Sequence, residues 1–279
     1  MKIALIVNKD KPRATAVAEQ AAQILSEGGA ELFSFADCPI GGTVVKDSAE
    51  EAIRDCDVAV TIGGDGTIIH NAKFAAFYRK PLLGVNMGRI GFVANIEPEE
   101  LSELKKLLTG DFRVQRRMLL DIGVEKDGEV RRFTAVNEAV LHRDSLSNMI
   151  EISVALDEEK ILTYRADGML FATPTGSTAY SFSAGGPVIE PDMRCILLNP
   201  VCPHALCSRP VVFGGDSELT AYVHPDFTLK CYLTVDGQNY IPVSSDDRIT
   251  VKRSELELQL IILKEKNFYT LLNEKLKEF

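Results

Sequence analysis

The sequence predicts two domains of different class, a Rossmann-like α/β domain at the N-terminus and an antiparallel β-sandwich domain after it. Two observations lead to this prediction. Over the first hundred residues, apolar β-rich runs alternate with helical stretches, which is typical of a parallel sheet covered by helices on both faces. Beyond Asp111 the pattern changes to short alternating runs separated by turns, which is typical of antiparallel sheets. The length of 279 residues fits two such domains.

The α/β domain is expected to span residues 1–111. Its predicted elements are the apolar strands 2–7, 57–62 and 81–86 and the helices 14–26 and 48–55. A further helix begins at Pro98, with acidic residues in its first turn and leucines on one face, and Gly110 ends it. The strands are apolar over their whole length, so we expect both faces of this sheet to be buried.

The β-sandwich domain is expected to span residues 112–265. Its predicted strands are 117–124, 131–141, 150–156, 161–164, 218–223, 229–235 and 256–263. Residues 266–279 read as a helix with an apolar stripe formed by Phe268, Leu271, Leu272 and Leu276. This stripe needs a surface to cover, and we expect the helix to pack on the first domain.

Composition and charge favour a small-molecule partner. The chain has 31 Lys and Arg against 40 Asp and Glu, a net charge of −9, which disfavours binding to nucleic acid or to an anionic membrane. No apolar run approaches the roughly 20 residues that span a bilayer, and the first residues are not those of a signal peptide. A cytoplasmic protein is therefore expected.

The cysteines do not predict a metal centre. Six are scattered along the chain without a CxxC pair, and His204, between Cys202 and Cys207, does not complete a zinc spacing. We expect all six to be buried free thiols.

The strongest motif is the turn Gly63–Thr67, with sequence GGDGT, which follows a predicted strand and precedes a helical run. Glycines there let backbone N–H groups approach phosphate oxygens, and the helix N-terminus favours negative charge. The motif matches neither GxGxxG nor the Walker A sequence. A carboxylate beside phosphates is repelled unless it holds a divalent cation or accepts a proton from an attacking hydroxyl, which makes Asp65 a candidate for either task. The alternative is that Asp65 only caps the helix.

The second motif lies within residues 164–187, where the apolar run Met169–Ala172 leads into a turn rich in Pro, Gly, Ser and Thr. Small hydroxyl residues and glycines at this density supply hydrogen bonds and close backbone approach to a polar ligand. Tyr180 adds a face on which a ring can stack. An ordinary helix cap explains Ser177 or Thr178 but leaves the rest of the segment without a reason.

Together these motifs resemble those of the NAD kinase family, which makes NADP by phosphorylating the 2′-hydroxyl of the adenosine ribose of NAD. The turn Gly63–Thr67 also occurs in the diacylglycerol, sphingosine and 6-phosphofructo-type kinases, whereas the segment 167–187 is particular to NAD kinases. Further matches, in the family's order, are 86–92, 137–138, 203–206, 209–210 and 236–238. Met87 and Arg89 replace residues that are more usual in the family.

The resemblance implies a role for individual residues. Asp65 matches the catalytic aspartate that takes the proton from the ribose hydroxyl, and Gly63, Gly64, Gly66 and Thr67 form the phosphate loop. Asn137 and Glu138 match the pair that holds the adenosine portion. The other NAD-binding positions that it implies, besides Asp65 and Gly66, are His70, Asn148, Arg165, Asp167, Thr178, Ala179, Tyr180, Ser181, Phe182, Ser183 and Gln238.

The resemblance also implies the substrates NAD and ATP (or inorganic polyphosphate), Mg2+ or another divalent cation, and a homodimer or homotetramer. A large polar residue at Arg165 goes with ATP and NAD in the family. Two other readings stay open: a lipid or sugar kinase of the same superfamily, and a non-catalytic NAD(P)-binding sensor. A lipid kinase should carry an amphipathic membrane-binding helix, which the sequence lacks. A sensor has no need of Asp65.

Overall fold

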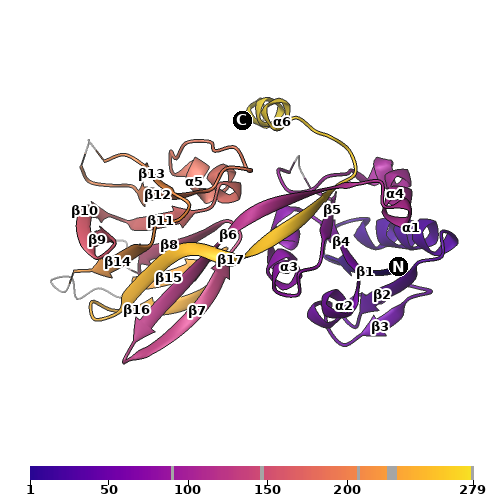
Figure 1. Ribbon diagram of the computed structural model, residues 1–279, viewed down its shortest axis with the longest axis horizontal. Coiled ribbons are helices and arrows are strands. Elements are labelled where there is room, and N and C mark those ends of the chain that lie inside the picture. The colour runs from indigo at the N-terminus through magenta and orange to yellow at the C-terminus, as the bar shows by residue number, and fades with distance from the viewer. Residues whose placement is uncertain (89–90, 145–147, 206–207, 225–230, 278–279) are drawn as a thin grey trace. The chain divides into compact units, whose positions relative to one another are not determined.

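The structure is a computed structural model that describes the whole chain except residues 89–90, 145–147, 206–207, 225–230 and 278–279. The chain forms two compact units (Figure 1). Unit 1 contains Met1–Arg117 and Leu256–Phe279, and unit 2 contains Met118–Glu255. The chain passes from one unit to the other within two long strands, β6 (Arg113–Lys126) and β17 (Arg248–Ile262).

Unit 1 is built on a parallel sheet with the strand order β3-β2-β1-β4-β5. Its strands are β1 (Lys2–Val7), β2 (Glu31–Phe35), β3 (Val44–Lys46), β4 (Val58–Gly63) and β5 (Leu82–Asn86). The last part of β17 lies beside β5, where Leu260 pairs with Leu82 in parallel. The central strands β4 and β5 are buried at every residue, as continuous apolar runs predict for a sheet covered on both faces.

The helices of unit 1 cover this sheet in two groups (Figure 1). They are α1 (Ala14–Glu27), α2 (Ala49–Asp55), α3 (Asp65–Phe77), α4 (Lys105–Thr109) and the 3-10 helix η1 (Pro98–Leu104). Helix α1 packs with η1 and α4, and α2 packs with α3. The core on the α1 side joins strand residues such as Leu5 and Val60 to Leu25 of α1 and Leu104 of η1, all fully buried.

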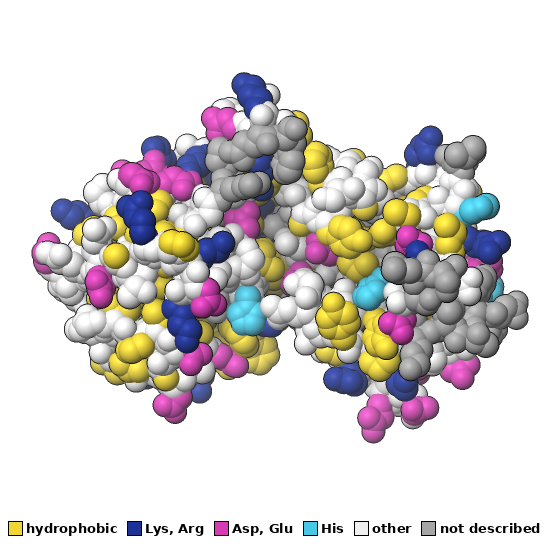
Figure 2. All heavy atoms as spheres, turned by 180° about the vertical axis from the view of Figure 1, so that it is seen from behind, with side chains coloured by type: hydrophobic (Ala, Val, Ile, Leu, Met, Phe, Trp, Pro, Cys, Tyr) yellow, Lys and Arg dark blue, Asp and Glu magenta, His cyan; other side chains and the backbone are white. Residues whose placement is uncertain are grey.

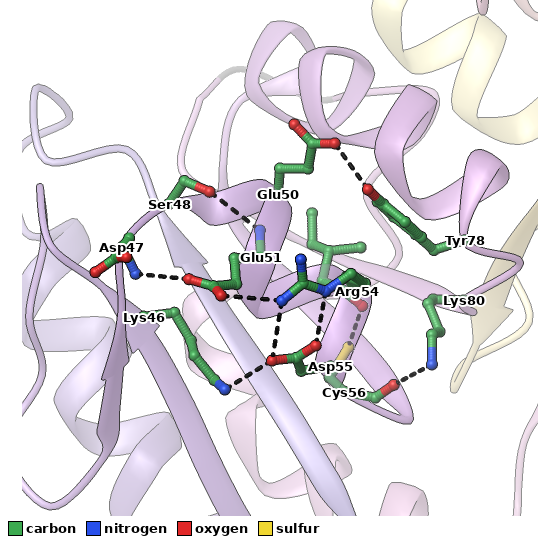
Figure 3. Close-up of polar contacts among 11 residues, drawn as sticks. Lys46, Asp47, Ser48, Glu50, Glu51, Arg54, Asp55, Cys56, Tyr78 and Lys80 are labelled. Carbon is green, nitrogen blue, oxygen red and sulfur yellow. Dashed lines mark hydrogen bonds and ion pairs between the residues drawn. The ribbon is translucent and has the colours of Figure 1, made fainter.

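Local sequence signals fix the two ends of helix α2 (Figure 3). The Ser48 hydroxyl accepts a hydrogen bond from the Glu51 N–H at 3.1 Å, which caps the helix. Glu50 and Glu51 lie in its first turn and Arg54 in its last, as the helix dipole favours. The Tyr78 hydroxyl, just after α3, donates to the Glu50 carboxylate at 2.9 Å and so holds α2 beside α3.

Unit 2 contains two antiparallel sheets. One has the order β13-β12-β11-β8-β15-β16, and in the other β10-β9-β14 continues to β17, with β6 beside β17 and β7. The strands not yet given are β7 (Glu129–Ala135), β8 (Glu138–Arg143), β9 (Ile150–Leu156), β10 (Glu159–Ala166), β11 (Gly168–Ala172), β12 (Cys195–Val201), β13 (Val211–Gly214), β14 (Leu219–Val223), β15 (Cys231–Val235) and β16 (Gln238–Val243). One core contains Leu141 and Phe171 from the first sheet with Ile152 and Leu219 from the second. This confirms the predicted fold class.

Two short helical segments follow β11 in unit 2. They are the 3-10 helix η2 (Thr175–Thr178) and α5 (Tyr180–Ser183), separated by Ala179. The segment that the sequence singled out for its hydroxyl residues is therefore strand, then a tight helical turn, then a single helical turn.

Helix α6 (Phe268–Leu276) belongs to unit 1. Asn267 caps it, since its side-chain oxygen accepts hydrogen bonds from the N–H groups of Tyr269 and Thr270. The Phe268 ring lies 5.9 Å from the Phe92 ring, and the Lys275 ammonium lies 4.4 Å from the Phe92 ring centroid.

The surface is mixed in charge. On the face shown in Figure 2, Lys and Arg side chains are scattered among Asp and Glu side chains, with apolar side chains between them. In the part of the chain that is described, no helix combines the length and the apolar character needed to cross a bilayer. The free cysteines Cys38, Cys56, Cys195 and Cys231 are buried as predicted, but Cys202 is exposed, so that prediction is wrong for Cys202. Cys207 lies outside the described residues.

Candidate active site

The glycine turn (Gly63–Thr67) joins the last residue of β4 to the first turn of α3. The Gly64 carbonyl accepts hydrogen bonds from the N–H groups of Thr67 at 2.9 Å and Ile68 at 3.2 Å, which closes that turn. A methyl group on Gly63 would lie 2.7 Å from the Thr67 side chain, so only glycine fits there. The first N–H groups of α3, from Asp65 and Gly66, have no partner within the helix and are available to an anion.

Asp65 is not the cap of α3. The capping position is Gly64, and no side chain caps the helix, which excludes the alternative that the sequence left open. The Asp65 Oδ2 oxygen instead accepts a hydrogen bond from the Phe92 N–H at 2.9 Å. Its Oδ1 oxygen is buried beneath Gly91 and accepts no hydrogen bond from the described residues. One oxygen of the carboxylate is therefore anchored while the other has no partner.

A cavity of about 920 Å3 in unit 1 contains the glycine turn on its wall. Its lining residues come from the end of β1 and the turn after it, the end of β2, the start of α2, the first turns of α3, and α6: Ile6, Val7, Asn8, Lys9, Asp10, Lys11, Phe35, Asp37, Cys38, Asp47, Ser48, Ala49, Gly64, Asp65, Gly66, Thr67, His70, Asn71, Gly88 and Lys275. Of the predicted site residues, it therefore gathers Asp65, Gly64, Gly66, Thr67 and the exposed His70. A site of this size holds a nucleotide-sized ligand.

A second set of predicted residues lies in unit 2, around Asn137 and Glu138. Asp236, in the turn between β15 and β16, accepts hydrogen bonds from the backbone N–H groups of Val136 (2.9 Å), Asn137 (2.7 Å) and Glu138 (3.1 Å). A carboxylate that binds three N–H groups fixes this backbone strongly. Gly176 packs so closely on Asn137 that an added methyl group would lie 2.6 Å from the Asn137 carbonyl carbon.

Glu138 is almost entirely buried and is unusual for a carboxylic acid. Burial, with the neighbouring Asp236 charge as the second cause, raises the pKa of Glu138 to about 8, against a hydrogen bond from the Tyr180 N–H that acts to lower it. At neutral pH the group is therefore mainly protonated. Its Oε2 oxygen has no partner among the described residues, so a protonated Glu138 can offer a hydrogen bond to a ligand.

Asp167 contacts the side chain of Arg143 in unit 2. The Arg143 guanidinium is 2.7 Å from Asp167 Oδ1 and also donates to the Asn148 carbonyl at 3.3 Å. Asp167 and Glu138 both act electrostatically on the Tyr180 hydroxyl, whose pKa is raised chiefly by partial burial. The structure therefore brings Glu138, Asp167 and Tyr180 together.

The residues between Thr178 and Ser183 divide into supporting and exposed groups. Ser181 is fully buried, and its carbonyl accepts a hydrogen bond from the Asn199 side chain at 3.0 Å. Tyr180, Phe182 and Ser183 are exposed, while Thr178 and Ala179 are partly buried. Of the other predicted positions in unit 2, Arg165 and Asn148 are exposed and Gln238, at the start of β16, is half-buried. Their roles stay predictions.

Sequence reasoning gave no role to five residues that shape these sites. Asn8, Gly91 and Phe92 surround the glycine turn, and Arg143 and Asp236 hold the residues of unit 2. Gly91, Phe92 and Asp236 lay inside motifs that were noticed, and an aspartate before glycine in a hairpin turn was the available signal for Asp236. Nothing in the local sequence marks Asn8 or Arg143.

No three His, Cys, Asp or Glu side chains in the described parts of the chain are grouped so that they could hold a metal ion. Mg2+ does not need such a cage when it arrives on phosphates, because one or two carboxylates and water then complete its shell. Of the carboxylates that line the cavity, Asp65 lies at the glycine turn and could hold such an ion through a bound water.

Comparisons with known proteins agree with this geometry. The ATP-NAD kinase N-terminal domain matches residues 34–112, and the ATP-NAD kinase C-terminal domain matches residues 136–263. The NAD kinase of Moorella thermoacetica is 38% identical, over 99% of this chain and 89% of that protein. The NAD kinase of Heliobacterium modesticaldum is 36% identical, over 99% of this chain and 98% of that protein.

Two solved structures have the same fold. The NAD kinase from Archaeoglobus fulgidus in complex with ATP is 25% identical with a TM-score of 0.77, and the match covers both chains completely. Yeast NADH kinase complexed with NADH is 23% identical with a TM-score of 0.86, over 99% of this chain and 87% of that chain. With relatives above 30% identity along nearly the whole chain and both domains matched, this protein belongs to the family of ATP-dependent NAD kinases.

Proposed function

We propose that Asp65 is the base that takes the proton from the 2′-hydroxyl of the NAD ribose as the terminal phosphate of ATP is transferred to it. The observation that carries this proposal is that the two oxygens of the Asp65 carboxylate have different surroundings. Oδ2 is held by the Phe92 N–H, whereas Oδ1 is buried without a partner. A buried acceptor without a donor is costly, so the arrangement favours a ligand that brings a proton to it.

The reaction then balances as a single phosphoryl transfer. The ribose 2′-oxygen forms a bond to the terminal phosphorus while the bond from that phosphorus to its bridging oxygen breaks, and the electron pair leaves with ADP. The hydroxyl proton goes to Asp65. The N–H groups at the start of α3 stabilise the negative charge on the transferred phosphate, since they are fixed before the reaction begins.

Mg2+ is the cation that this proposal adds to the site. Bound to the phosphates of ATP, the ion would neutralise charge on them, and Asp65 would hold it through a bound water, which leaves Oδ1 to accept the ribose proton. The protein's own part is to place the phosphates at the glycine turn and to hold the carboxylate in a fixed direction by the Phe92 N–H.

For NAD we infer that the adenosine portion binds at Asn137 and Glu138. The pKa of Glu138, raised to about 8, keeps it protonated at neutral pH, so it can donate a hydrogen bond from Oε2 to a ring nitrogen or a ribose oxygen. The exposed ring of Tyr180, close to Glu138 and Asp167, offers a stacking surface. We propose two or four copies of the chain as the assembly.

The test of Asp65 is the variant Asp65→Asn. NADP formation from NAD, ATP and Mg2+, measured with an NADP-specific dehydrogenase, should fall by about 100- to 10,000-fold, while the affinity for NAD, measured by calorimetry, stays within a few-fold. Asp111→Asn, at an exposed aspartate of unit 1 outside the cavity, is the matched control and should keep full activity. Unchanged turnover in Asp65→Asn would remove the proposed base.

A further inference from the structure

The turn between β1 and α1 lies beside the glycine turn and is fastened to it by Asn8. The Asn8 side chain donates to the Thr67 hydroxyl at 3.0 Å, and its N–H donates to the Ile62 carbonyl at 3.1 Å. Asn8 also shapes its own turn, because its side-chain oxygen accepts from the Asp10 N–H and its carbonyl accepts from the Lys11 N–H. The position of Lys11 is therefore tied to the position of the glycine turn.

Lys11 extends from this turn over the glycine turn. Its Cε atom lies 3.9 Å from the point that a Cβ on Gly64 would occupy, and its side chain lines the same cavity as Asp65. Lys11 is exposed, and its ammonium group makes no hydrogen bond or ion pair with the residues that the structure describes. A free ammonium beside backbone N–H groups at a helix N-terminus is placed to bind an anion.

The other residues that line the cavity limit the positions that an anion can occupy. Carboxylates line the cavity as well as cations, so no overall positive field would draw a phosphate chain to every part of it. Asn71, 3% exposed, also lines the cavity, and its own carboxamide oxygen is buried and accepts no hydrogen bond from the described residues. A carboxamide oxygen cannot accept from a phosphate, so Asn71 adds no phosphate contact through that oxygen.

We propose that Lys11 binds the terminal phosphate of the phosphoryl donor and so supplies, from the β1–α1 turn, the lysine that the glycine turn lacks. In the Walker A motif a lysine within the loop itself reaches the terminal phosphates. Here the turn Gly63–Thr67 contains no lysine, and Lys11 reaches over it from the neighbouring strand's end. Its charge offsets the repulsion between Asp65 and the donor's phosphates.

The proposal rests on the proposed function, because it takes the donor to lie at Asp65. The chemistry that Lys11 recognises is a terminal phosphate on a chain of phosphates, which a nucleoside triphosphate and a linear polyphosphate share. The KM for ATP and the KM for polyphosphate, measured side by side, distinguish these two sources.

The test compares Lys11→Met and Lys11→Arg with the native enzyme. Lys11→Met removes the charge and keeps most of the apolar stem, and the KM for ATP, the KM for polyphosphate (if the native enzyme uses it) and the Kd for inorganic tripolyphosphate should each rise by about 10- to 100-fold. Lys11→Arg should recover part of this loss. The Kd for ADP should change by less than the Kd for a non-hydrolysable ATP analogue, because ADP lacks the terminal phosphate.

Two comparison variants make the result specific. Lys9→Met removes another cation from the same turn and the same cavity. It should raise the KM for ATP by less than Lys11→Met does if the position beside Gly64 decides the effect. Lys105→Met, at an exposed lysine of α4 outside the cavity lining, should leave all constants unchanged. The NAD affinity should be unaffected in every variant.

The outcomes separate this inference from the proposed function. Native enzyme that fails to make NADP from ATP and NAD would contradict the proposed function itself. Native activity together with an unchanged KM for ATP in Lys11→Met would overturn the role of Lys11 alone. A loss of NAD affinity instead of donor affinity would place Lys11 at the other substrate and would likewise overturn the proposal.

Discussion

The glycine turn of unit 1 and the region around Glu138 in unit 2 each leave one carboxyl oxygen without a partner among the described residues, but different contacts fix the backbone around it. At the glycine turn, backbone contacts and close approach of glycines set the geometry, and Asp65 Oδ1 and the Lys11 ammonium stay without partners among the described residues. Around Glu138, the carboxylate of Asp236 binds three backbone N–H groups, and Asn199 holds the Ser181 carbonyl.

The difference follows from what each region does in the proposed reaction. Groups that meet phosphates have no protein partner but sit on a rigid backbone, so they can bind the ligand without first breaking other contacts. Groups that recognise one face of a nucleoside work best when they are buried and fixed in advance, because little order is then lost on binding. Burial of Glu138 is what raises its pKa to about 8.

The largest effect is expected from a substitution that disturbs the geometry around Asp65 in unit 1. In Gly91→Ala, the added methyl group would lie 2.8 Å from Asp65 Cγ and 2.9 Å from Oδ2, so either the carboxylate or the backbone that holds it must move. We expect kcat to fall by about 100-fold or more, since a displacement of about 1 Å at a reacting group has this cost. Steady-state kinetics with ATP and NAD measures it.

Gly41→Ala is the control for this variant, because nothing lies within 4 Å of the added methyl group. It should be as active as the native enzyme. A Gly91→Ala enzyme that keeps its kcat would show that Asp65 does not need the contact with Gly91 and Phe92. Close packing of glycines would then not explain the geometry of the site in unit 1.

The next effect tests the fixed geometry of unit 2. In Asp236→Asn, an NH2 group that cannot accept a hydrogen bond replaces one carboxylate oxygen. The variant loses the bond from the Val136 N–H if Oδ2 is replaced, or the bonds from the Asn137 and Glu138 N–H groups if Oδ1 is replaced. Asparagine tolerates the left-handed backbone of this residue (φ 49°), so the loss comes from the hydrogen bonds. We expect the free energy of unfolding to fall by about 1.5 to 3 kcal/mol, measured by urea denaturation, and the NAD affinity to fall with it.

Asp157→Asn is the matched control. Asp157 has the same left-handed backbone (φ 49°) and is exposed in the turn between β9 and β10. Its side chain makes no hydrogen bond with the described residues, so the substitution should change stability by no more than about 0.5 kcal/mol. Equal effects of the two variants would contradict the role of Asp236.

The architecture could be predicted from the sequence because each strand and helix leaves a local pattern of apolar residues. Continuous apolar runs identified the buried strands of unit 1, such as β4 and β5, and alternating runs identified the antiparallel strands. The glycine turn was found because its strand, glycines and helix lie within ten residues. Cys202 shows the limit of a general tendency, since it is exposed where burial was predicted.

The anchors of both sites could not be predicted because they come from distant parts of the chain. Phe92 lies 27 residues from Asp65, and Asp236 lies about 100 residues from the backbone that it fixes. No spacing rule links such residues, because only the folded sheet brings the strand ends together. Whether Asp65 caps its helix was likewise undecidable from the turn alone, and the structure excludes the cap, since no side chain caps α3 and Asp65 accepts from the Phe92 N–H instead.

The last prediction, whose effect per pH unit is the smallest, is a pH dependence that belongs to unit 2. The folded pKa of Glu138, about 8, lies above its ordinary value of 4.5, so between these values the folded chain keeps a proton that the unfolded chain has lost. The contribution of the protonated group to stability is therefore complete below pH 4.5 and is lost as pH rises through about 8. Glu138→Gln mimics the protonated acid at every pH. Relative to this variant, the native protein should lose at most about 1.4 kcal/mol per pH unit between pH 5.5 and 7.5.

Urea denaturation of both proteins at pH 5.5, 6.5 and 7.5 measures this difference. Glu129→Gln, at an exposed glutamate of the same unit, should follow the native protein at all three values. A constant difference between native protein and Glu138→Gln would mean that Glu138 is already ionised when folded. Its Oε2 would then be an acceptor rather than a donor, and the adenosine would have to bring the proton. Each region would in that case present a carboxylate with one unpartnered oxygen, and charge would no longer distinguish Glu138 of unit 2 from the proposed base of unit 1.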